Sequence, residues 1–326
     1  MAETQRPRRV VVATHGHCFD GMASAALFTW LYRSLEGANA SFAYHACDYG
    51  PGEGGVPAGW MNGDENAILD YRYSPLPSLS WYFDHHGTAF QGPGDREHYE
   101  KRRSLRGAYD PAYSSCTKLI VDAAREKYGL EPPEHMRPLV AWADRIDAAR
   151  FADVREAVDR QDPVLQLMTV VEHHGHTHFV AIMVPRLLSK PVEEVALADD
   201  VQALYVPLAK KRAGALAEIE ARARLVGRVA LCDLSEVATE VIEKFALYAL
   251  YPEALYAVTV TRTPSKLKVS VGYNPWSTAP REHDIGAICR RYGGGGHPVV
   301  GAFARPVDKL EEARALAASV VEELQG

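Results

Sequence analysis

The stretch of sequence that decides the fold is VVVATHGHCFDGMASAAL, residues 10–27. A run of valines typical of a buried strand ends in two histidines, a cysteine and an aspartate, and a helix-like apolar stretch follows Gly21. Such a junction puts polar groups where a parallel strand stops and the next helix starts, which is where open α/β sheets usually bind their ligands. We therefore expect a functional site within the first twenty residues or so of the chain.

Strand-like and helix-like segments alternate beyond this junction. The pattern predicts strands at residues 10–13, 40–46, 67–69 and 81–83, and helices at residues 22–32, 115–128 and 134–149. Residues 48–63 are rich in glycine and proline and predict a loop. Strands that alternate with helices are typical of an α/β fold with a parallel, doubly wound sheet.

A second, smaller α/β domain is expected in the last third of the chain. Residues 191–225 are rich in Ala, Glu, Leu, Lys and Arg, which predicts a solvated helix that links two domains. Strands are then expected at residues 228–231, 255–262 and 266–271, and helices at residues 236–245, at 284–292 and after Pro306. The sequence therefore predicts a first domain at residues 1–190, a linker helix at 191–225 and a second domain at 226–326, with a cleft between the two domains.

Composition and charge limit the classes of function. The chain has 326 residues, 47% of them apolar, which is enough for two cores. A formal net charge of −6 argues against a track for long nucleic acid, because such binding depends on many lysines and arginines. The five scattered cysteines include no CxxC pair, which favours a reducing cytoplasm over a disulfide framework or a zinc ribbon. We find no signal-peptide core and no long apolar window, so we expect a cytoplasmic protein away from membranes.

Polar side chains follow several of the expected strands, and they are His15, Cys18, Asp20, Asp70, Asp84, His85 and His86. Carboxylates and imidazoles that meet at one edge of a sheet would repel one another or lack solvent unless divalent cations lay among them. Asp144 and Asp147 are one turn apart on a predicted helix, and either could complete the cluster. Mixed oxygen and nitrogen ligands suit manganese, iron or magnesium better than a structural zinc.

These segments resemble the motifs of a known family. HGHCFDG (15–21), ILDY (68–71), FDHHGTAF (83–90) and AWADRID (141–147) resemble, in order, the four motifs of the DHH phosphoesterases. CRRYGGGGHPVVGAF (289–303) is similar to the glycine-rich signature of the associated DHHA1 domain. The resemblance covers nearly the whole chain, and its first motif matches a branch that reads HxxCxDG, as in oligoribonuclease-like or nanoRNase-like phosphodiesterases.

The resemblance implies a two-metal phosphodiesterase, usually manganese-dependent, that cleaves short oligonucleotides or linear dinucleotides such as pGpG or pApA. In the matched positions His15 and Cys18 would hold one ion, Asp20, His85 and Asp144 the other, and Asp70 would bridge the two. Asp84 and His86 would orient ligands and water or face the phosphate. Iron, zinc and magnesium are alternatives to manganese, and the softer thiolate of Cys18 favours iron or zinc, or weak binding, at the first ion. Alternatively, Cys18 is a small thiol packed under the loop.

The tail motif has its own expected role. Consecutive glycines let backbone amides approach a ligand closely, and the resemblance implies that Gly294, Gly295, Gly296 and His297 form a loop that grips the nucleotide. A flexible helix cap and turn is the alternative. Many relatives carry an arginine at the end of the preceding strand, whereas this chain reads VSVGYNPW at residues 269–276. Asn274 is therefore a candidate substrate contact, and Tyr273 or Trp276 could stack on a base.

Other polar residues receive a structural interpretation. His17 is expected to face solvent or substrate, because His15 takes the position of the metal ligand. Asp147 is expected to pair on the helix surface with Arg145 or Arg150. EHHGHTH, residues 172–178, is expected to be a polar loop between domains, because no partner segment with ligand spacing accompanies it.

Several functions stay open at this stage. A cyclic-dinucleotide phosphodiesterase and an adenosine bisphosphate phosphatase would use the same chemistry. Pyrophosphatases of related type carry a lysine-rich second domain, which the GGGGH tail argues against. From another class, a nucleotide-binding regulator without turnover is indicated only by Cys18. The exact nucleotide and the assembly, including a homodimer, are left open by the sequence.

Overall fold

The computed structural model describes residues 6–48, 55–237, 243 and 245–326. The chain divides into two compact units, the first formed by Met1–Arg150 and Asp162–Tyr205 and the second by Phe151–Gln161 and Val206–Gly326. The helix α9 (Asp199–Arg222) lies inside the segment predicted as a linker and runs from the first unit into the second. The short segment 151–161, which the sequence assigns to the first domain, belongs to the second unit.

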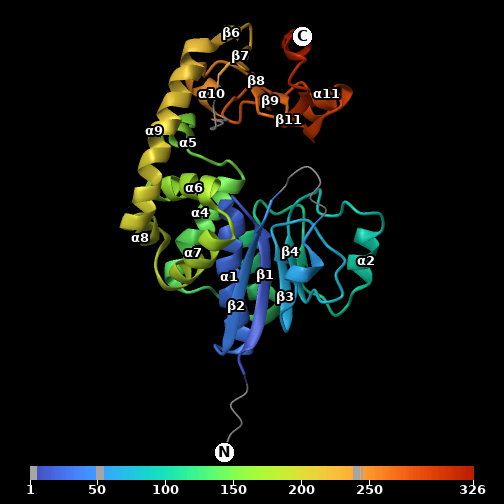
Figure 1. Ribbon diagram of the computed structural model, residues 1–326, viewed down its shortest axis with the longest axis vertical. Helices are drawn as coiled ribbons and strands as arrows, with labels where there is room; N and C mark the ends of the chain where they lie inside the picture. Colours follow the sequence, from blue (N-terminus) through green and yellow to red (C-terminus); the bar gives the residue numbers. More distant parts are fainter. Residues whose placement is uncertain (1–5, 49–54, 238–242, 244) are drawn as a thin grey trace, which may run out of the picture. The chain divides into compact units, whose positions relative to one another are not determined.

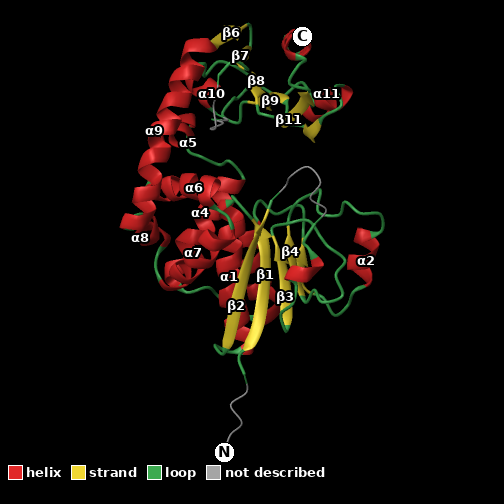
Figure 2. Ribbon diagram, viewed as in Figure 1, coloured by secondary structure: helices red, strands yellow, loops and turns green. Residues whose placement is uncertain are grey.

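The first unit is built on a five-stranded parallel sheet (Figures 1 and 2). Its strands are β1 (Arg8–His15), β2 (Ala40–Cys47), β3 (Glu65–Leu69), β4 (Trp81–Asp84) and β5 (Arg106–Tyr109). They lie in the order β2-β1-β3-β4-β5, and every neighbouring pair is parallel. The predicted α/β class with a parallel sheet is thus confirmed, and the chain changes its direction across the sheet between β1 and β3.

Helix α1 (Phe19–Glu36) is buried around its first half because it is covered on several sides. It packs on the sheet and against α3 (Cys116–Tyr128), α4 (Arg137–Asp147) and α7 (Thr177–Ser189). The ring of Phe28 meets that of Trp81 edge-on at 5.5 Å, and Tyr32 also contacts Trp81. A helix that is apolar around its circumference is expected to be buried, and α1 fits this rule.

The other face of this sheet is covered by chain connections, by the 3-10 helix η1 (Ala58–Trp60) and by α2 (Asp95–Lys101). Tyr73, Tyr82, Phe90 and Tyr99 form an aromatic cluster there, with ring centroids 5.1–6.3 Å apart. Aromatic rings at these separations contribute both buried area and favourable edge-to-face contacts. This layer supports the loops that follow β3 and β4.

The remaining helices of the first unit are η2 (Glu134–Met136), α6 (Pro163–His174), α7 and α8 (Val192–Ala196). The prediction of a polar loop between domains at residues 172–178 is wrong, because these residues form the end of α6, a tight turn at Gly175 and the start of α7. Among the described residues, no helix combines the length and apolar character needed to cross a membrane.

The second unit contains a six-stranded mixed sheet in the order β10-β11-β9-β8-β7-β6. Its strands are β6 (Ala223–Val226), β7 (Val229–Leu234), β8 (Tyr256–Arg262), β9 (Leu267–Tyr273), β10 (Gly295–His297) and β11 (Val300–Arg305). Only the pair β7–β8 is parallel among these strands, and the other neighbours are antiparallel. Its helices are α5 (Val154–Asp159), α10 (Ala246–Leu250), α11 (Ile285–Arg291) and α12 (Leu310–Glu323).

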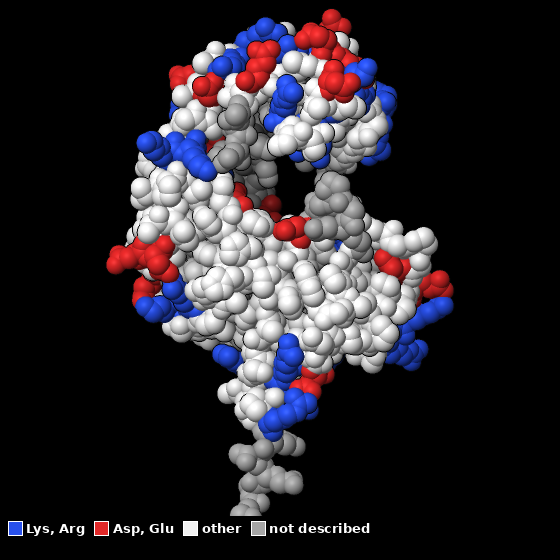
Figure 3. All heavy atoms as spheres, viewed as in Figure 1, with Lys and Arg blue, Asp and Glu red and all other residues white. Residues whose placement is uncertain are grey.

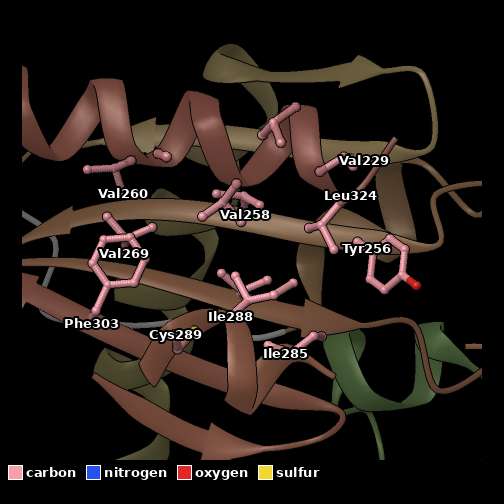
Figure 4. Packing of buried hydrophobic residues seen from close by; sticks show 14 of the residues in the cluster. Val229, Tyr256, Val258, Val260, Val269, Ile285, Ile288, Cys289, Phe303 and Leu324 are labelled. Carbon is pink, nitrogen blue, oxygen red and sulfur yellow. The ribbon is translucent and has the colours of Figure 1, made fainter. Parts of the chain in front are cut away.

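One face of the second sheet packs against α11 and α12 (Figure 4). Val258, Val260 and Val269 of the strands share one apolar cluster with Ile288 of α11, and Phe303 of β11 belongs to the same core (Figure 4). The alternate residues Ala230, Cys232 and Ala257 face the opposite cluster, next to α10. Because successive side chains along each strand point to opposite faces, the two apolar clusters lie on opposite faces of the sheet, as expected for a sheet buried on both faces.

Two sequence predictions for this unit need comment. The helix predicted at residues 236–245 falls largely on residues 238–242 and 244, which lie outside the described residues, and α10 follows at Ala246. The glycine-rich segment is predicted as a loop, but Gly295–His297 forms strand β10 and pairs with β11. Glycine disfavours strands when considered alone, so only the hairpin partner reveals this strand.

Candidate metal centre

The polar residues singled out in the sequence converge at the carboxyl edge of the first sheet. His15 is the last residue of β1, Asp70 directly follows β3, and Asp84 ends β4. Strands β1 and β3 are neighbours, and the chain reverses its direction across the sheet between them. A crevice at such a switch point is where ligands bind in open α/β sheets.

Asp70 is the centre of this arrangement. It is fully buried and adopts φ 54°, an uncommon left-handed conformation for a residue other than glycine. Its Oδ2 lies 3.4 Å from Nδ1 of His15, and its Oδ1 lies 3.4 Å from Nε2 of His85 and 3.8 Å from Nδ1 of His86. The backbone N–H of Asp70 donates to the carbonyl of Phe83, which fixes this turn to β4.

Two groups of three ligand atoms share Asp70. His15, Asp70 and His86 form one group, and Asp20, Asp70 and His85 form the other, with the ligand atoms of each group within 4.8 Å of one another. Within the described residues, no other set of His, Cys, Asp and Glu side chains meets this condition. A carboxylate shared by two such groups is the arrangement expected for a pair of neighbouring divalent cations.

The residues around His86 hold its ring in place. Asp84 is fully buried, and its Oδ1 lies 2.7 Å from Nδ1 of His86 and accepts the backbone N–H of His86 at 3.3 Å. The hydroxyl of Tyr82 donates to Asp84 Oδ2 at 3.0 Å. Asp84 thus orients the imidazole of His86, in the way that carboxylates behind metal-binding histidines do.

His85 is positioned by the loop before α3, and Asp20 by the first turn of that helix. Nδ1 of His85 lies 3.1 Å from the carbonyl of Tyr113, so Nε2 is turned toward the carboxylates. The carboxylate of Asp20 accepts the backbone N–H groups of Cys116 at 2.7 Å and Thr117 at 3.0 Å. Asp20 therefore accepts two hydrogen bonds at the positive end of a helix, but burial and the charges of Asp70 and Asp147 raise the pKa of its carboxyl well above the usual value.

The structure distinguishes between the two aspartates of α4. Oδ2 of Asp147 lies 3.3 Å from Nε2 of His85, at the centre of the site. Asp144 instead accepts a hydrogen bond from Ser114 and pairs with Arg150. Of the two partners expected for Asp147, Arg145 and Arg150, the second pairs with Asp144 instead. The structure thus places Asp147, one turn later on the helix than Asp144, beside His85, although Asp147, like Asp144, is outside both three-ligand groups.

Cys18 lies at the start of α1 and is half-buried. Burial, followed by the charges of Asp70, Asp147 and Asp20, raises the pKa of its thiol well above the usual value. Its sulfur is not part of either three-ligand group. The thiol thus lies within range of the negative charges of three carboxylates. A cation nearby would be needed to favour its thiolate form.

Without a cation, protons balance part of the negative charge in this site. Burial opposes ionisation of Asp70, but its contacts with His15 and His85 outweigh burial and hold the pKa of Asp70 well below its usual range. Burial would lower the pKa of His85, yet Asp70, Asp20 and Asp147 raise it to about 10. Burial and the charge of Asp70 raise the pKa of Asp147 to about 6. Protons therefore occupy positions that a divalent cation would take.

The donor set fits divalent cations. Within the described residues, both carboxylate oxygens of Asp70 and Nε2 of His85 are buried and make no hydrogen bond. Buried polar atoms of this kind are rare unless they serve an ion or water. Their oxygen and nitrogen chemistry suits manganese, iron, magnesium or zinc.

The predicted substrate residues lie in the second unit. His297 and Gly296 are exposed at β10, and Gly294 packs so closely that an added Cβ would lie 2.1 Å from the carbonyl of Ala302. Gly296 adopts φ 148°, and a Cβ there would meet the carbonyl of Val300 at 2.2 Å. These two glycines are required by the backbone of the hairpin, and the exposed imidazole of His297 is the group that a ligand could reach.

Asn274 has a structural role in place of the predicted substrate contact. Its side chain is 2% exposed, and its amide donates to the carbonyl of Ala254 at 2.9 Å. Its Oδ1 accepts the backbone N–H of Trp276 at 3.0 Å. The indole N–H of Trp276 donates a hydrogen bond to the carbonyl of Phe151. The side chain of Asn274 therefore stabilises the turn after β9.

Comparisons with known proteins support the fold. No family model matches the chain, and no curated protein matches it. Among solved structures, it is similar to PggH, a pGpG-specific phosphodiesterase from Vibrio cholerae, with a TM-score of 0.67 and 19% identity over 98% of this chain and 100% of that one. An exopolyphosphatase-related protein from Bacteroides fragilis gives a TM-score of 0.57 and 12% identity over 98% and 93%. The DHH domain of a protein assigned to a family of ribosomal proteins gives a TM-score of 0.65 and 13% identity over 97% of this chain and 87% of that one. The chain shares the fold of these proteins.

Proposed function

We propose that the chain is a metal-dependent phosphodiesterase of the DHH/DHHA1 type, which hydrolyses short oligonucleotides (nanoRNA) or linear dinucleotides such as pGpG or pApA to mononucleotides. In this proposal the first unit carries the metal-binding catalytic site. The second unit carries the DHHA1-like substrate-binding hairpin with His297. Manganese is the favoured ion.

The observation that carries the proposal is the shared carboxylate of Asp70 in two three-ligand groups. Three buried or partly buried carboxylates and three imidazoles meet at one sheet edge, and so many ionisable groups are costly to bury together unless they serve bound cations. The similarity of fold to a pGpG-specific phosphodiesterase supports the same reaction class.

Each side chain then has a defined task. His15 and His86 would hold one ion, Asp20 and His85 the other, and Asp70 both. Asp147 would complete the second group in place of Asp144, and Cys18 is a further ligand candidate for the first. When bound, two divalent cations would neutralise charge on the phosphate and lower the pKa of a water molecule that attacks phosphorus.

The surrounding residues prepare this site. Asp84 keeps the ring of His86 in one orientation, and the carbonyl of Tyr113 does the same for His85. The buried walls contributed by α1 and α3 exclude bulk water from one side, which strengthens charge interactions within the site. A preorganised set of ligands lowers the cost of stabilising the charge that develops on a phosphate.

A short substrate fits the charge of the molecule. The net charge is −6, and on the face seen in Figure 3 basic side chains are interspersed with acidic ones. A long strand would need many phosphate contacts from lysines and arginines. A dinucleotide needs few such contacts beyond the metal ions.

The proposal is tested by incubating the chain with Mn²⁺ and a panel of pGpG, pApA, longer oligonucleotides, cyclic di-GMP and adenosine bisphosphate, with products separated by chromatography. We expect mononucleotides from the linear dinucleotides and no product after Asp70→Ala. Glu126→Gln, an exposed carboxylate on α3, is the matched control and should keep full activity. Tight nucleotide binding without release of any mononucleotide would overturn the enzyme assignment.

A further inference from the structure

The turn between α6 and α7 contacts the loop that carries the first metal ligands. We propose that this turn, residues 172–177, is a brace for the metal-site loop, residues 15–18, and that His17 is the positioning residue through which it acts. The inference rests on the proposed function only in that the loop must hold a cation. It gives a role to the histidine-rich segment that the catalytic proposal leaves without one.

The metal-site loop has an unfavourable backbone at its centre. His17 adopts φ 53°, in the left-handed region where a side chain with a Cβ is crowded by its own carbonyl. Such conformations persist where surrounding contacts hold them, and they are concentrated at functional sites. The contacts that hold His17 therefore decide the shape of this loop.

Those contacts come from the α6–α7 turn. The backbone N–H of His17 donates to the carbonyl of Gly175 at 3.1 Å, and Nδ1 of its ring lies 3.1 Å from the carbonyl of Glu172. Because a carbonyl only accepts, Nδ1 must carry the hydrogen in this contact. Nearby, the hydroxyl of Thr177 accepts the backbone N–H of Ala46, which ties the end of β2 to the start of α7.

The turn fits the loop too closely for any residue but glycine at position 175. An added Cβ at Gly175 would lie 2.6 Å from the backbone nitrogen of His17 and 2.5 Å from the carbonyl of Val171. Both neighbours are backbone atoms, so neither can move without displacing the loop or α6. Shape and hydrogen bonds together therefore fix the turn against His17.

The histidines of this region are engaged in local structure and not in a metal site of their own. Nδ1 of His173 lies 2.9 Å from the carbonyl of Thr169, and Nδ1 of His176 accepts the backbone N–H of Phe179 at the start of α7. Within the described residues, no three-ligand group includes His17 or a histidine of the turn. These contacts favour a brace over a second metal site.

The consequence of a loose brace would be felt at the metal ligands. His15 and Cys18 flank His17 within the same loop, and Nδ1 of His15 lies 3.4 Å from Asp70. Movement of His17 would change the distance between His15 and Asp70. Loss of an outer partner of this kind typically weakens metal binding by roughly 10- to 100-fold.

The test measures Mn²⁺ binding to the full chain without substrate, by electron paramagnetic resonance of the free ion. His17→Ala removes the ring contact and Gly175→Ala inserts a methyl group against the loop. His17→Asn tolerates the left-handed conformation and keeps a side-chain donor, so it should restore part of the affinity. His178→Ala, an exposed histidine in the first turn of α7, is the matched control. Thermal unfolding in EDTA monitors the stability of each variant.

We expect His17→Ala and Gly175→Ala to weaken Mn²⁺ binding by roughly 10-fold or more, His17→Asn to lie between these and the wild type, and His178→Ala to match the wild type. Unchanged Mn²⁺ affinity in folded His17→Ala and Gly175→Ala would overturn the brace, even if their unfolding temperatures fell. A wild-type chain that binds no Mn²⁺ would remove the proposed function as well, so the two failures are distinguishable.

Discussion

The carboxyl edge of the first sheet and the hairpin β10–β11 of the second sheet carry the two most distinctive motifs of this chain. At the sheet edge the motif residues meet through side chains, and Asp70 is fully buried among imidazoles and carboxylates. In the hairpin the motif residues meet through the backbone, because Gly294 and Gly296 leave room for the carbonyls of β11. Substitutions at the edge should therefore change chemistry, whereas substitutions of the hairpin glycines should change stability.

The largest effect is expected at Asp70. Asp70→Asn keeps the shape of the side chain but removes the charge shared by both ligand groups, so metal binding and hydrolysis should fall together by at least about 10³-fold. Steady-state kinetics on pGpG and Mn²⁺ titration measure the two losses. An Asp70→Asn chain that kept wild-type turnover would show that the carboxyl edge of the first sheet does not carry the chemistry.

A smaller effect should separate the two aspartates of α4. Asp147→Asn should lower kcat/KM by roughly 10²-fold or more, because Asp147 reaches His85. Asp144→Asn should cost roughly 10-fold, because Asp144 acts through Ser114 and Arg150. Parallel kinetics on the two variants decide the order, and a larger loss from Asp144→Asn would return the ligand position to that residue.

Metal binding at the sheet edge should depend on pH. The pKa of His85 is raised to about 10 by its carboxylate neighbours, so its proton must leave when a cation binds at pH 7. The pKa of Asp147 is raised to about 6, so protonation of Asp147 should weaken binding further as the pH falls through 6. Calorimetry of Mn²⁺ binding in buffers of different ionisation enthalpy should show proton release. Binding with no proton release and no pH dependence would contradict this description of the site.

The smallest effects are expected in the hairpin. Gly294→Ala should lower the free energy of unfolding by about 1–3 kcal/mol, because its methyl group would overlap the carbonyl of Ala302. His297→Ala should leave stability unchanged and raise KM by about 10-fold, since its imidazole is exposed. Denaturant unfolding and kinetics separate the two. A His297→Ala chain with lower stability and unchanged KM would show that this histidine, like the glycines, supports the hairpin and does not bind substrate.

The sequence predicts much of the first sheet because its signals are local. The valines before His15 and the short apolar runs before Asp70 and Asp84 indicate strands, and the alternation of strands with helices predicts that they are parallel. Strand β5 escapes prediction because RGAY is short and contains arginine and glycine, and its place is set by pairing with β4.

The site is harder to predict where the position of a side chain depends on one helical turn or on a contact between distant segments. Asp144 and Asp147 look equivalent in sequence, and only the rotation of α4 about its axis relative to β4 brings Asp147 to His85. His86 belongs with His15 because both imidazoles lie beside Asp70, and only the folded chain brings them there. The contact between His17 and Gly175 joins segments more than 150 residues apart, and no local pattern in either segment reveals it.

The most direct test of the central claim is anomalous diffraction from crystals of the chain grown with Mn²⁺. Two ions should appear at the carboxyl edge of the first sheet, with the carboxylate of Asp70 touching both, His15 and His86 at one ion, and Asp20 and His85 at the other. Absence of bound manganese at saturating concentration, or a single ion out of contact with Asp70, would contradict the account.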